Sequence, residues 1–141
     1  MSEYVSKKLR AEIAHRAGGQ CEYCRTPAAF STAPFVAEHI QPRARGGLTL
    51  SDNLVYACIG CNGYKQDKIE GFDSGSQTMV PLYHPRMHRW SEHFAWNEDF
   101  LLLIPLTDIG RVTISKLQLN RNGVINVRRL LILVGLHPSA L

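Results

Sequence analysis

The chain has 141 residues, of which 45% are hydrophobic and 20% are charged, a composition typical of an ordinary globular protein. No apolar run approaches the roughly 18 residues that a membrane-spanning helix needs, so the sequence predicts no transmembrane segment. The net charge of +4 is compatible with a phosphate-bearing partner, although many proteins of this size carry such a charge without one. The first residues lack a signal-peptide core, and we therefore expect a cytoplasmic protein.

The first predicted element is an amphipathic helix over residues 4–17. Its apolar positions recur about every four residues and form one stripe, which consists of Val5, Leu9, Ile13 and Ala17. Gly18-Gly19 ends this helix, because glycine accepts the left-handed conformation of a C-cap. The basic residues lie mostly off the stripe, where they are either solvated or in contact with a nucleic-acid backbone.

Four cysteines follow in two Cys-x-x-Cys pairs, and none is left over: Cys21, Cys24, Cys58 and Cys61. In a reducing cytoplasm this pattern indicates metal ligation rather than disulfides. Each pair supplies two corners of a thiolate tetrahedron, and we expect a structural Zn²⁺ there. Residues 20–72 are too few to bury a large apolar core, so the zinc is expected to hold this part of the chain together.

Between and after the cysteine pairs the sequence predicts two short strands and a helix. The first strand covers residues 35–40 and the second covers 54–57. The loop between them contains Gly46-Gly47, which lets the backbone turn sharply and approach another group closely. The helix is predicted over residues 62–70, with Gly71 closing it.

After residue 72 the character of the sequence changes. We expect a core over residues 1–72 and a C-terminal extension over residues 73–141 that packs on it. Residues 73–78 are small and polar and predict a linker or surface loop. The remaining expected elements are a hairpin formed by 94–96 and 100–106, a helix over 109–117 capped by Thr107, and a last helix over 123–134.

Several apolar and aromatic residues of the extension are predicted to lie in its core. They are Val127, Leu130, Leu131 and Val134 in the last helix, together with Trp90, Phe94 and Trp96. The run from Phe100 to Ile104 is typical of a buried strand. His15 and His137 are expected at the surface, whereas His84, His88 and His93 are compatible either with packing or with a contact to DNA.

A candidate active site lies inside and next to the cysteine bracket. The carboxylate of Glu38 and the amide oxygen of Asn62 are hard ligands that suit Mg²⁺ or Mn²⁺. The imidazole of His39 can take a proton from water near neutral pH, and Lys65 can offer a point charge to a phosphate. Neighbouring side chains of a strand point to opposite faces, so we expect a tight turn or a bulge to bring Glu38 and His39 into one site.

Order and spacing over about residues 18–70 resemble the HNH endonuclease family of the four-cysteine kind. The matching elements are Cys21-x-x-Cys24, Glu38-His39-Ile40-x-Pro42, Gly46-Gly47, Asn53-Leu54 and Cys58-x-x-Cys61-Asn62-x-x-Lys65. The resemblance implies an α+β fold with a ββα-metal (His-Me finger) core, in which two antiparallel strands and a helix surround one catalytic cation. The Cys₄ zinc site would staple this core, with a helix before it and a hairpin and helices after it.

The resemblance also implies a role for each matching residue. Glu38 corresponds to the first ligand of the catalytic cation, and His39 corresponds to the general base. Asn53 corresponds to the asparagine that orients the histidine and ties the loop. Asn62 corresponds to the last metal ligand, a position where histidine is usual and asparagine also occurs in active relatives, and this exchange favours Mg²⁺ or Mn²⁺.

These features lead to the hypothesis of a metal-dependent endonuclease that nicks or cuts DNA, with structural Zn²⁺ and catalytic Mg²⁺ or Mn²⁺. Candidate contacts to the DNA backbone are Arg43, Arg45, Arg86 and Arg89. The main alternative is a non-catalytic zinc module that binds nucleic acid or a partner protein. Cleavage of RNA and formation of a homo-oligomer also stay open.

Overall fold

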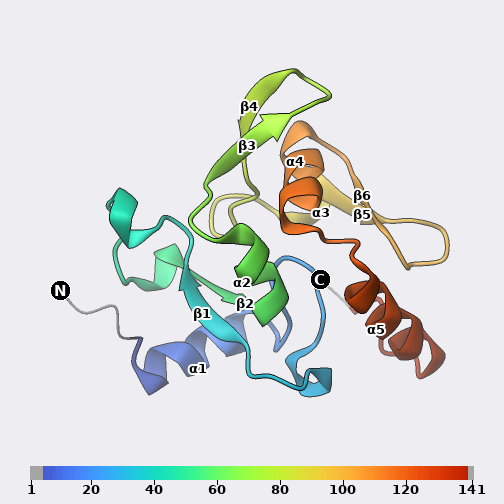
Figure 1. Cartoon of the computed structure of the whole chain (residues 1–141). Helices are drawn as coiled ribbons and strands as arrows, with labels where there is room; N and C mark the ends of the chain where they lie inside the picture. The colour runs from blue at the N-terminus through green and yellow to red at the C-terminus, as the bar shows by residue number, and fades with distance from the viewer. Residues whose placement is uncertain (1–4, 140–141) are drawn as a thin grey trace. The chain divides into compact units, whose positions relative to one another are not determined.

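The computed structural model describes residues 5–139, which form five α-helices and three two-stranded antiparallel sheets (Figure 1). The chain divides into two units, Met1–Ile69 and Glu70–Leu141, each with its own internal packing. The predicted mixture of helices and small sheets is therefore confirmed. None of the helices in the described part of the chain has the length and apolar character needed to cross a bilayer.

The N-terminal unit begins with α1 (Lys7–Arg16), which covers the predicted apolar stripe. The Ser6 hydroxyl caps this helix by accepting a hydrogen bond from the Leu9 amide at 3.1 Å. Gly18 and Gly19 follow with φ of +67° and +72°, the left-handed conformation expected for the end of the helix. Val5 and Ile13 pack against Leu54 and form the apolar core of this unit.

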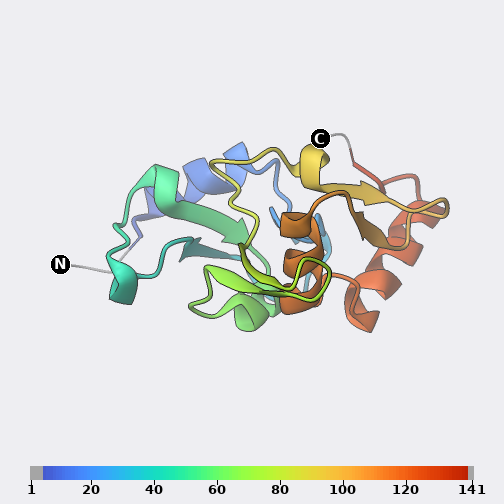
Figure 2. The ribbon, with the colours of Figure 1, turned by 90° about the horizontal axis from the view of Figure 1, so that it is seen from above.

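Two strands, β1 (Val36–His39) and β2 (Leu54–Ala57), pair antiparallel in a regular register. Glu38 lies opposite Val55 and His39 lies opposite Leu54. Helix α1 covers the face of this pair that carries Leu54, and α2 (Ile59–Lys65) contacts β1 from the other side (Figures 1 and 2). Three short 3₁₀ turns complete the unit: η1 (Ala28–Phe30), η2 (Arg43–Arg45) and η3 (Ser51–Asn53).

Helix α2 is shorter and begins earlier than predicted. Cys58 is its N-cap, and the helix ends at Lys65 because Gln66 adopts a positive φ of 53°. Gly71 does not close a helix. It lies in β3 (Glu70–Asp73), which pairs with β4 (Thr78–Pro81). The expected helix over residues 62–70 is corrected accordingly.

The segment predicted as a linker or surface loop, residues 73–78, forms the turn of the β3–β4 hairpin, so it is a surface loop and not a linker. Asp73 is buried at the start of this turn, where its carboxylate receives two hydrogen bonds of 2.8 Å from the Arg111 guanidinium. The Ser76 amide donates a third hydrogen bond at 2.9 Å. This polar turn is thus anchored to the helix that carries Arg111.

The rest of the C-terminal unit follows the predicted order. Helix α3 (Trp90–His93) leads into β5 (Phe94–Trp96), which pairs with β6 (Leu103–Pro105). Helices α4 (Asp108–Leu117) and α5 (Asn122–Leu133) come next. As predicted, the Thr107 hydroxyl caps α4, accepting from the Gly110 amide at 3.0 Å. Trp90 and Phe94 are buried, also as predicted.

Part of the predicted core of this unit is wrong. Leu130 and Val134 are 65% and 67% exposed, because α5 turns the face that carries Val124, Arg128 and Leu131 inward. The buried Arg128 donates hydrogen bonds of 2.8 Å to two backbone carbonyls of the same unit. A charged residue therefore occupies a place that the pattern assigns to an apolar one.

Two further expectations for this unit are also corrected. His137 is buried rather than exposed, since its ring lies edge-on against Trp96 at 4.5 Å and Nε2 is 2.8 Å from the carbonyl oxygen of Phe100. Of the run from Phe100 to Ile104, only Leu103 is fully buried. The run belongs to a hairpin with one solvated face, so only every second side chain can pack inward.

Candidate active site and metal centre

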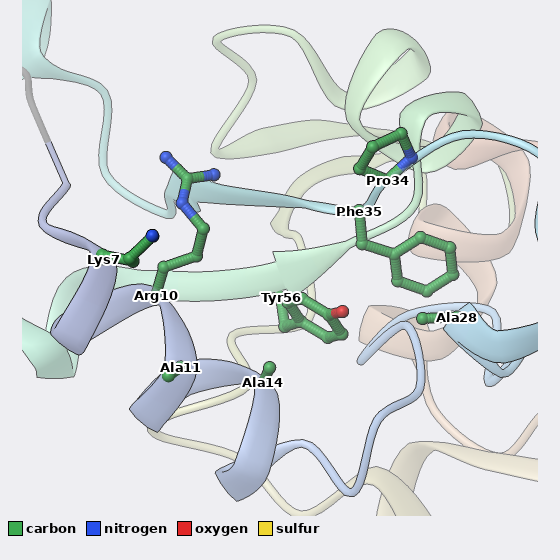
Figure 3. A pocket seen from close by; sticks show the side chains of 8 residues that line it. All are labelled: Lys7, Arg10, Ala11, Ala14, Ala28, Pro34, Phe35 and Tyr56. Carbon is green, nitrogen blue, oxygen red and sulfur yellow. The ribbon is translucent and has the colours of Figure 1, made fainter.

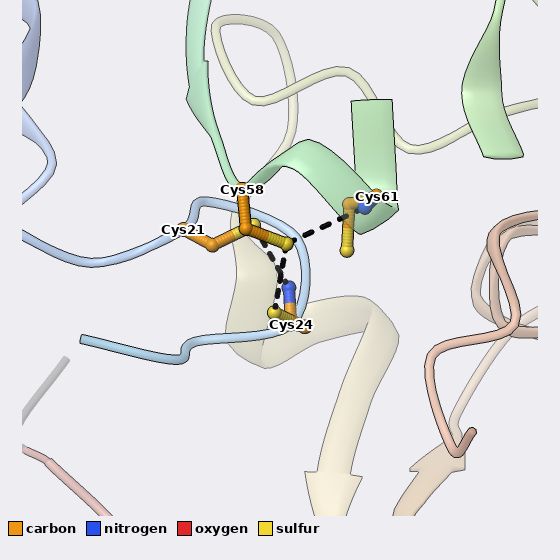
Figure 4. A group of neighbouring side chains, drawn as sticks. All are labelled: Cys21, Cys24, Cys58 and Cys61. Atoms are coloured by element: carbon orange, nitrogen blue, oxygen red, sulfur yellow. Dashed lines mark hydrogen bonds between the residues drawn. The ribbon is translucent and has the colours of Figure 1, made fainter. Parts of the chain in front are cut away.

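The four cysteines converge on one point in the N-terminal unit (Figure 4). All four are buried, and their sulfur atoms lie within 4.8 Å of one another. The backbone amides of Cys24 and Cys61 donate to the sulfur atoms of Cys21 and Cys58, which is the tight geometry of two metal knuckles. Within residues 5–139, no other group of three or more His, Cys, Asp or Glu side chains converges in this way.

The chemistry of this cluster fits zinc. The sulfur atoms of Cys24 and Cys58 are 3.8 Å apart, and a tetrahedron with Zn–S bonds of about 2.3 Å has edges of about 3.8 Å. Burial raises the pKa of the Cys21 thiol, whereas hydrogen bonds from the neighbouring thiols lower the pKa of Cys58. Four buried thiolates repel one another, and a divalent cation removes that repulsion.

Glu38 and His39 lie side by side at the end of β1. The strand alternation turns them to opposite faces, and the strand has no bulge, so the expected turn or bulge is not how they meet. The Glu38 carboxylate instead folds back along the strand. Its Oε1 accepts a hydrogen bond from the His39 amide at 3.1 Å and lies 3.7 Å from His39 Nδ1.

The other ring nitrogen of His39 has a partner that the sequence pattern does not single out. Nε2 lies 2.8 Å from the hydroxyl of Thr49, in the loop between β1 and β2. The ring is largely buried, with its side chain 9% exposed, while the Glu38 side chain is 37% exposed. Thr49 is the only hydroxyl in the run from Arg43 to Leu50, and that was the one signal for it in the sequence.

Asn53 ties the ends of this loop together, and within the described residues its side chain forms no hydrogen bond with the histidine ring. Its Oδ1 accepts from the Gln41 amide at 2.9 Å, and its Nδ2 donates to the carbonyls of Gln41 and Leu48. Gly47 lies so close to this clamp that a Cβ there would collide with the carbonyl oxygen of Gln41. The predicted close approach at Gly46-Gly47 is therefore present, with Gly46 at φ of +88°.

Lys65 points inward rather than to solvent. It is 2% exposed, and its Nζ donates a hydrogen bond of 3.0 Å to the carbonyl of Ile40, the residue after His39. Burial lowers the pKa of Lys65, and the nearby negative charge of Glu38 opposes that shift. The ammonium that was expected to hold a phosphate supports the backbone behind the Glu38-His39 pair.

Asn62 lies in the first half of α2, one residue after Cys61, and is partly buried. Its backbone is fixed by the helix, with the amide donating to the carbonyl of Cys58 at 3.0 Å. Because Asn62 directly follows Cys61, the cysteine cluster fixes the position of its backbone. Helix α2 also packs on β1, the strand that carries Glu38. Of the arginines considered for DNA contacts, Arg45 and Arg89 are exposed, and Arg43 and Arg86 are partly buried.

Arg16 is a further residue that sequence reasoning missed. Its guanidinium reaches from the end of α1 to the start of β2, where it donates to the carbonyls of Ser51 and Leu54 and to the Ser51 hydroxyl, each at 2.9 Å. The basic residues of α1 were read as solvated or facing nucleic acid. This one instead holds the second end of the loop that carries Thr49.

Comparison with known families gives one match to the part of the chain that carries this arrangement. Residues 21–73 match the family model described as HNH endonuclease. This segment is similar to the HNH endonuclease family. A search of the curated proteins finds no match to the chain. The HNH segment contains all four cysteines, and the cysteine cluster fits the zinc-containing type of the family. It also contains the candidate site residues Glu38, His39, Thr49, Asn53, Asn62 and Lys65.

The match to the HNH family favours nucleic acid as the class of substrate. The family segment extends from the first cysteine into β3, so it includes β1, β2 and α2. Helix α1 and most of the C-terminal unit lie outside it. The chemistry of the HNH segment therefore has to come from the short hairpin, its loop and the helix that follows.

Proposed function

We propose that the chain is a metal-dependent endonuclease that hydrolyses phosphodiester bonds of DNA. In this proposal β1, β2 and α2 act as a ββα-metal core. The observation that carries it is the placement of the His39 ring, which is held at Nε2 by Thr49 while Nδ1 faces the Glu38 carboxylate. A structural histidine buried for packing alone does not need a carboxylate on one nitrogen and a hydroxyl on the other.

The protonation of His39 follows from these two contacts. We assign the ring proton to Nε2, where it is donated to the Thr49 hydroxyl. Nδ1 then keeps its lone pair and can accept a proton from the attacking water. The imidazolium formed in that step lies 3.7 Å from Glu38 Oε1, so the carboxylate stabilises its charge.

Glu38 and Asn62 are the side chains that would hold the catalytic cation. One carboxylate oxygen and one amide oxygen are a donor set that suits Mg²⁺ or Mn²⁺, which keep several waters and bind substrate phosphate directly. When bound, the cation supplies positive charge that stabilises the non-bridging and leaving oxygens of the phosphate. Lys65 acts from behind, holding the Ile40 carbonyl and adding positive charge near Glu38.

The decisive experiment is cleavage of supercoiled plasmid by the zinc-loaded protein with Mg²⁺ or Mn²⁺. We expect nicked or linear product from the wild type. Because a general base contributes about 10²-fold or more, His39→Ala should lower the rate by at least that factor. Gel electrophoresis over time measures both rates, and thermal melting of both proteins checks that the variant is folded.

Three outcomes would contradict this proposal. Equal cleavage by His39→Ala and wild type would show that His39 is not the general base. If cleavage persists after the divalent cation has been chelated while the zinc stays bound, the reaction does not need a catalytic cation. A gel shift without any nicking would instead favour the non-catalytic zinc module.

A further inference from the structure

A cavity of about 370 Å³ lies in the N-terminal unit, on the face of the hairpin that α1 covers (Figure 3). The rings of Phe35 and Tyr56 form one wall. The opposite wall is α1, whose Ala11 and Ala14 are too small to fill the space. The register places Tyr56 on the same face of the hairpin as His39 and on the opposite face from Glu38. None of Glu38, His39 and Asn62 lines the cavity.

Two cations stand at one end of the cavity. Lys7 and Arg10 line it and are exposed, and Figure 3 shows their charged groups beside each other, away from the Phe35 ring. Neither side chain forms a hydrogen bond or ion pair with any other residue in the described range 5–139. The cavity lining contains no acidic side chain, so this end of it attracts an anion.

The aromatic wall is rigid. Phe35 and Tyr56 pack with ring centroids 5.3 Å apart. The Tyr56 backbone is held by Glu22 at both ends, since Tyr56 N donates to Glu22 Oε2 and Glu22 N donates to the Tyr56 carbonyl, each at 2.9 Å. Glu22 lies between Cys21 and Cys24, so the metal knuckle fixes this wall in place. The Tyr56 hydroxyl has no hydrogen-bond partner elsewhere in residues 5–139.

We propose that this cavity binds one unpaired nucleobase of a nucleic-acid strand, with Lys7 and Arg10 on the adjoining phosphate. The ligand that fits these walls has a flat apolar body, a polar edge within reach of a phenol, and a negative charge at one end. A base that is stacked and paired in a duplex cannot present its face to the ring wall, whereas an unpaired base can. Stacking on aromatic side chains tolerates any base, so the site selects strand structure and not sequence.

This inference rests on the proposed function only in taking nucleic acid as the partner. It gives the protein a way to prefer substrates with a single-stranded or frayed nucleotide next to a duplex. It concerns binding and involves no chemical step at the cavity.

The test is fluorescence anisotropy of labelled oligothymidylate and of a labelled duplex of equal length, with the full-length, zinc-loaded protein and no catalytic cation. Ala14→Trp fills the cavity from the helix side. We expect it to weaken single-strand binding about ten-fold, the loss of one base–aromatic stack, and to leave duplex binding unchanged. Ala11→Leu, at an exposed position of the same wall, is a second filling variant that removes no buried contact.

The charge at the mouth is tested with the double variant Lys7→Gln and Arg10→Gln. It should weaken single-strand binding and flatten its dependence on salt concentration, because phosphate contacts release counterions. Lys8→Gln is the matched control, since Lys8 is an exposed lysine of the same helix that does not line the cavity. Lys8→Gln should weaken single-strand binding less than the double variant Lys7→Gln and Arg10→Gln does.

Unchanged single-strand binding by both filling variants would overturn the inference. So would an equal loss of single-strand and duplex binding, because that result indicates only a basic surface. The outcome is independent of catalysis: a wild type that binds through the cavity but never cleaves would refute the proposed function and leave this inference standing. If the wild type cleaves and the filling variants bind single strands normally, this inference is refuted and the proposed function stands.

Discussion

The imidazole of His39 sits between two oxygen atoms of different character, a hydroxyl on Nε2 and a carboxylate near Nδ1. A hydroxyl can accept the Nε2 proton without changing charge, and so it fixes the ring without competing for the proton at Nδ1. The distance of 3.7 Å between Nδ1 and the carboxylate is too long for a hydrogen bond. In the proposed function, proton transfer takes place at the other ring nitrogen, Nδ1.

The first prediction concerns Thr49 as a positioning residue. Thr49→Val removes the hydroxyl and keeps the shape, and we expect kcat to fall about ten-fold or more with little change in KM, because the ring loses its fixed tautomer and orientation. Thr49→Ser should restore most of the rate. Steady-state kinetics across pH on a short duplex measure both, and the acid limb of the profile should change for Val and not for Ser.

A purely structural role for Thr49 has a different signature. In that case the rate loss would follow the loss of thermal stability, Ser would not rescue it, and the pH profile would keep its form. If a Thr49 variant still binds zinc and gives any of these three results, the assigned tautomer of His39 is contradicted.

The second prediction concerns the glycine at the loop clamp. Gly47→Ala places a methyl group against the Gln41 carbonyl and 2.9 Å from Asn53 Nδ2, so we expect it to lower the free energy of unfolding by about 2 kcal/mol. Gly63→Ala is the control, since an added Cβ there meets nothing within 4 Å and lies in α2. Alanine should stabilise that helix by up to about 1 kcal/mol. Urea unfolding of both variants measures these changes. If Gly47→Ala leaves the free energy of unfolding unchanged, the close packing of Gly47 against Gln41 and Asn53 is contradicted.

At the scale of elements, the two loops that the sequence marks as polar are the ones most strongly tied down. The loop from Gln41 to Asn53 is clamped by Asn53 and held at its far end by Arg16. The β3–β4 turn is anchored to α4 by the pair of Asp73 and Arg111. In both cases side-chain hydrogen bonds replace the apolar contacts that such short elements lack.

The third prediction tests the anchor of the β3–β4 turn. Hydrogen bonds from Arg111 and Ser76 lower the pKa of Asp73 below its ordinary value. The stabilisation that this carboxylate provides is therefore complete above about pH 4 and is lost as the pH falls through the folded-state pKa. Asp73→Asn should lower the melting temperature at pH 7, and the gap to wild type should shrink in acid.

Asp108→Asn is the matched control for that experiment. Asp108 pairs with the same guanidinium at 3.2 Å, but its side chain is 57% exposed, so its loss should cost little. Melting curves followed by circular dichroism between pH 7 and pH 3 measure all three proteins. A gap between Asp73→Asn and wild type that is constant over this range would mean that the carboxylate charge contributes nothing.

At the scale of the whole molecule, the chain is two units stabilised by different means. The N-terminal unit has a small apolar core around Ile13 and Leu54 and relies on the cysteine cluster. The C-terminal unit contains no cysteine and packs its aromatic side chains around Trp90 and Phe94. Metal should therefore matter to one unit and not to the other.

The last prediction follows from this difference. Structural zinc contributes apparent binding energy on the order of 10 kcal/mol, far more than the small core of the N-terminal unit can replace. Cys58→Ser should unfold residues 5–69 and abolish cleavage, while the elements of residues 70–139 keep their amide protection. Hydrogen exchange resolved by residue measures this. An unchanged exchange pattern and melting curve in Cys58→Ser would contradict the zinc role.

Local chemistry was enough to predict those features whose cause lies within a few residues. The cysteine spacing, the caps at Thr107 and Gly18, and the strand at 54–57 all depend on nearest neighbours along the chain. The α+β class and the metal cluster followed from them. The roles of Glu38, His39, Asn53 and Asn62 came from a resemblance in spacing, and they stay predictions until cleavage is measured.

Tertiary structure decided the features that depend on a partner far along the chain. Helix periodicity made Leu130 and Val134 look buried, but which face of α5 turns inward was settled by the carbonyls that Arg128 reaches. Spacing made Lys65 a candidate for holding a phosphate, but the packing of α2 on β1 buries its side chain, and its ammonium group contacts the carbonyl of Ile40. Nothing in the sequence pattern links Thr49 to His39, whereas in the folded hairpin its hydroxyl lies 2.8 Å from His39 Nε2. Sequence patterns carry the propensity of each segment, whereas the partner of a polar side chain is known only once distant segments meet.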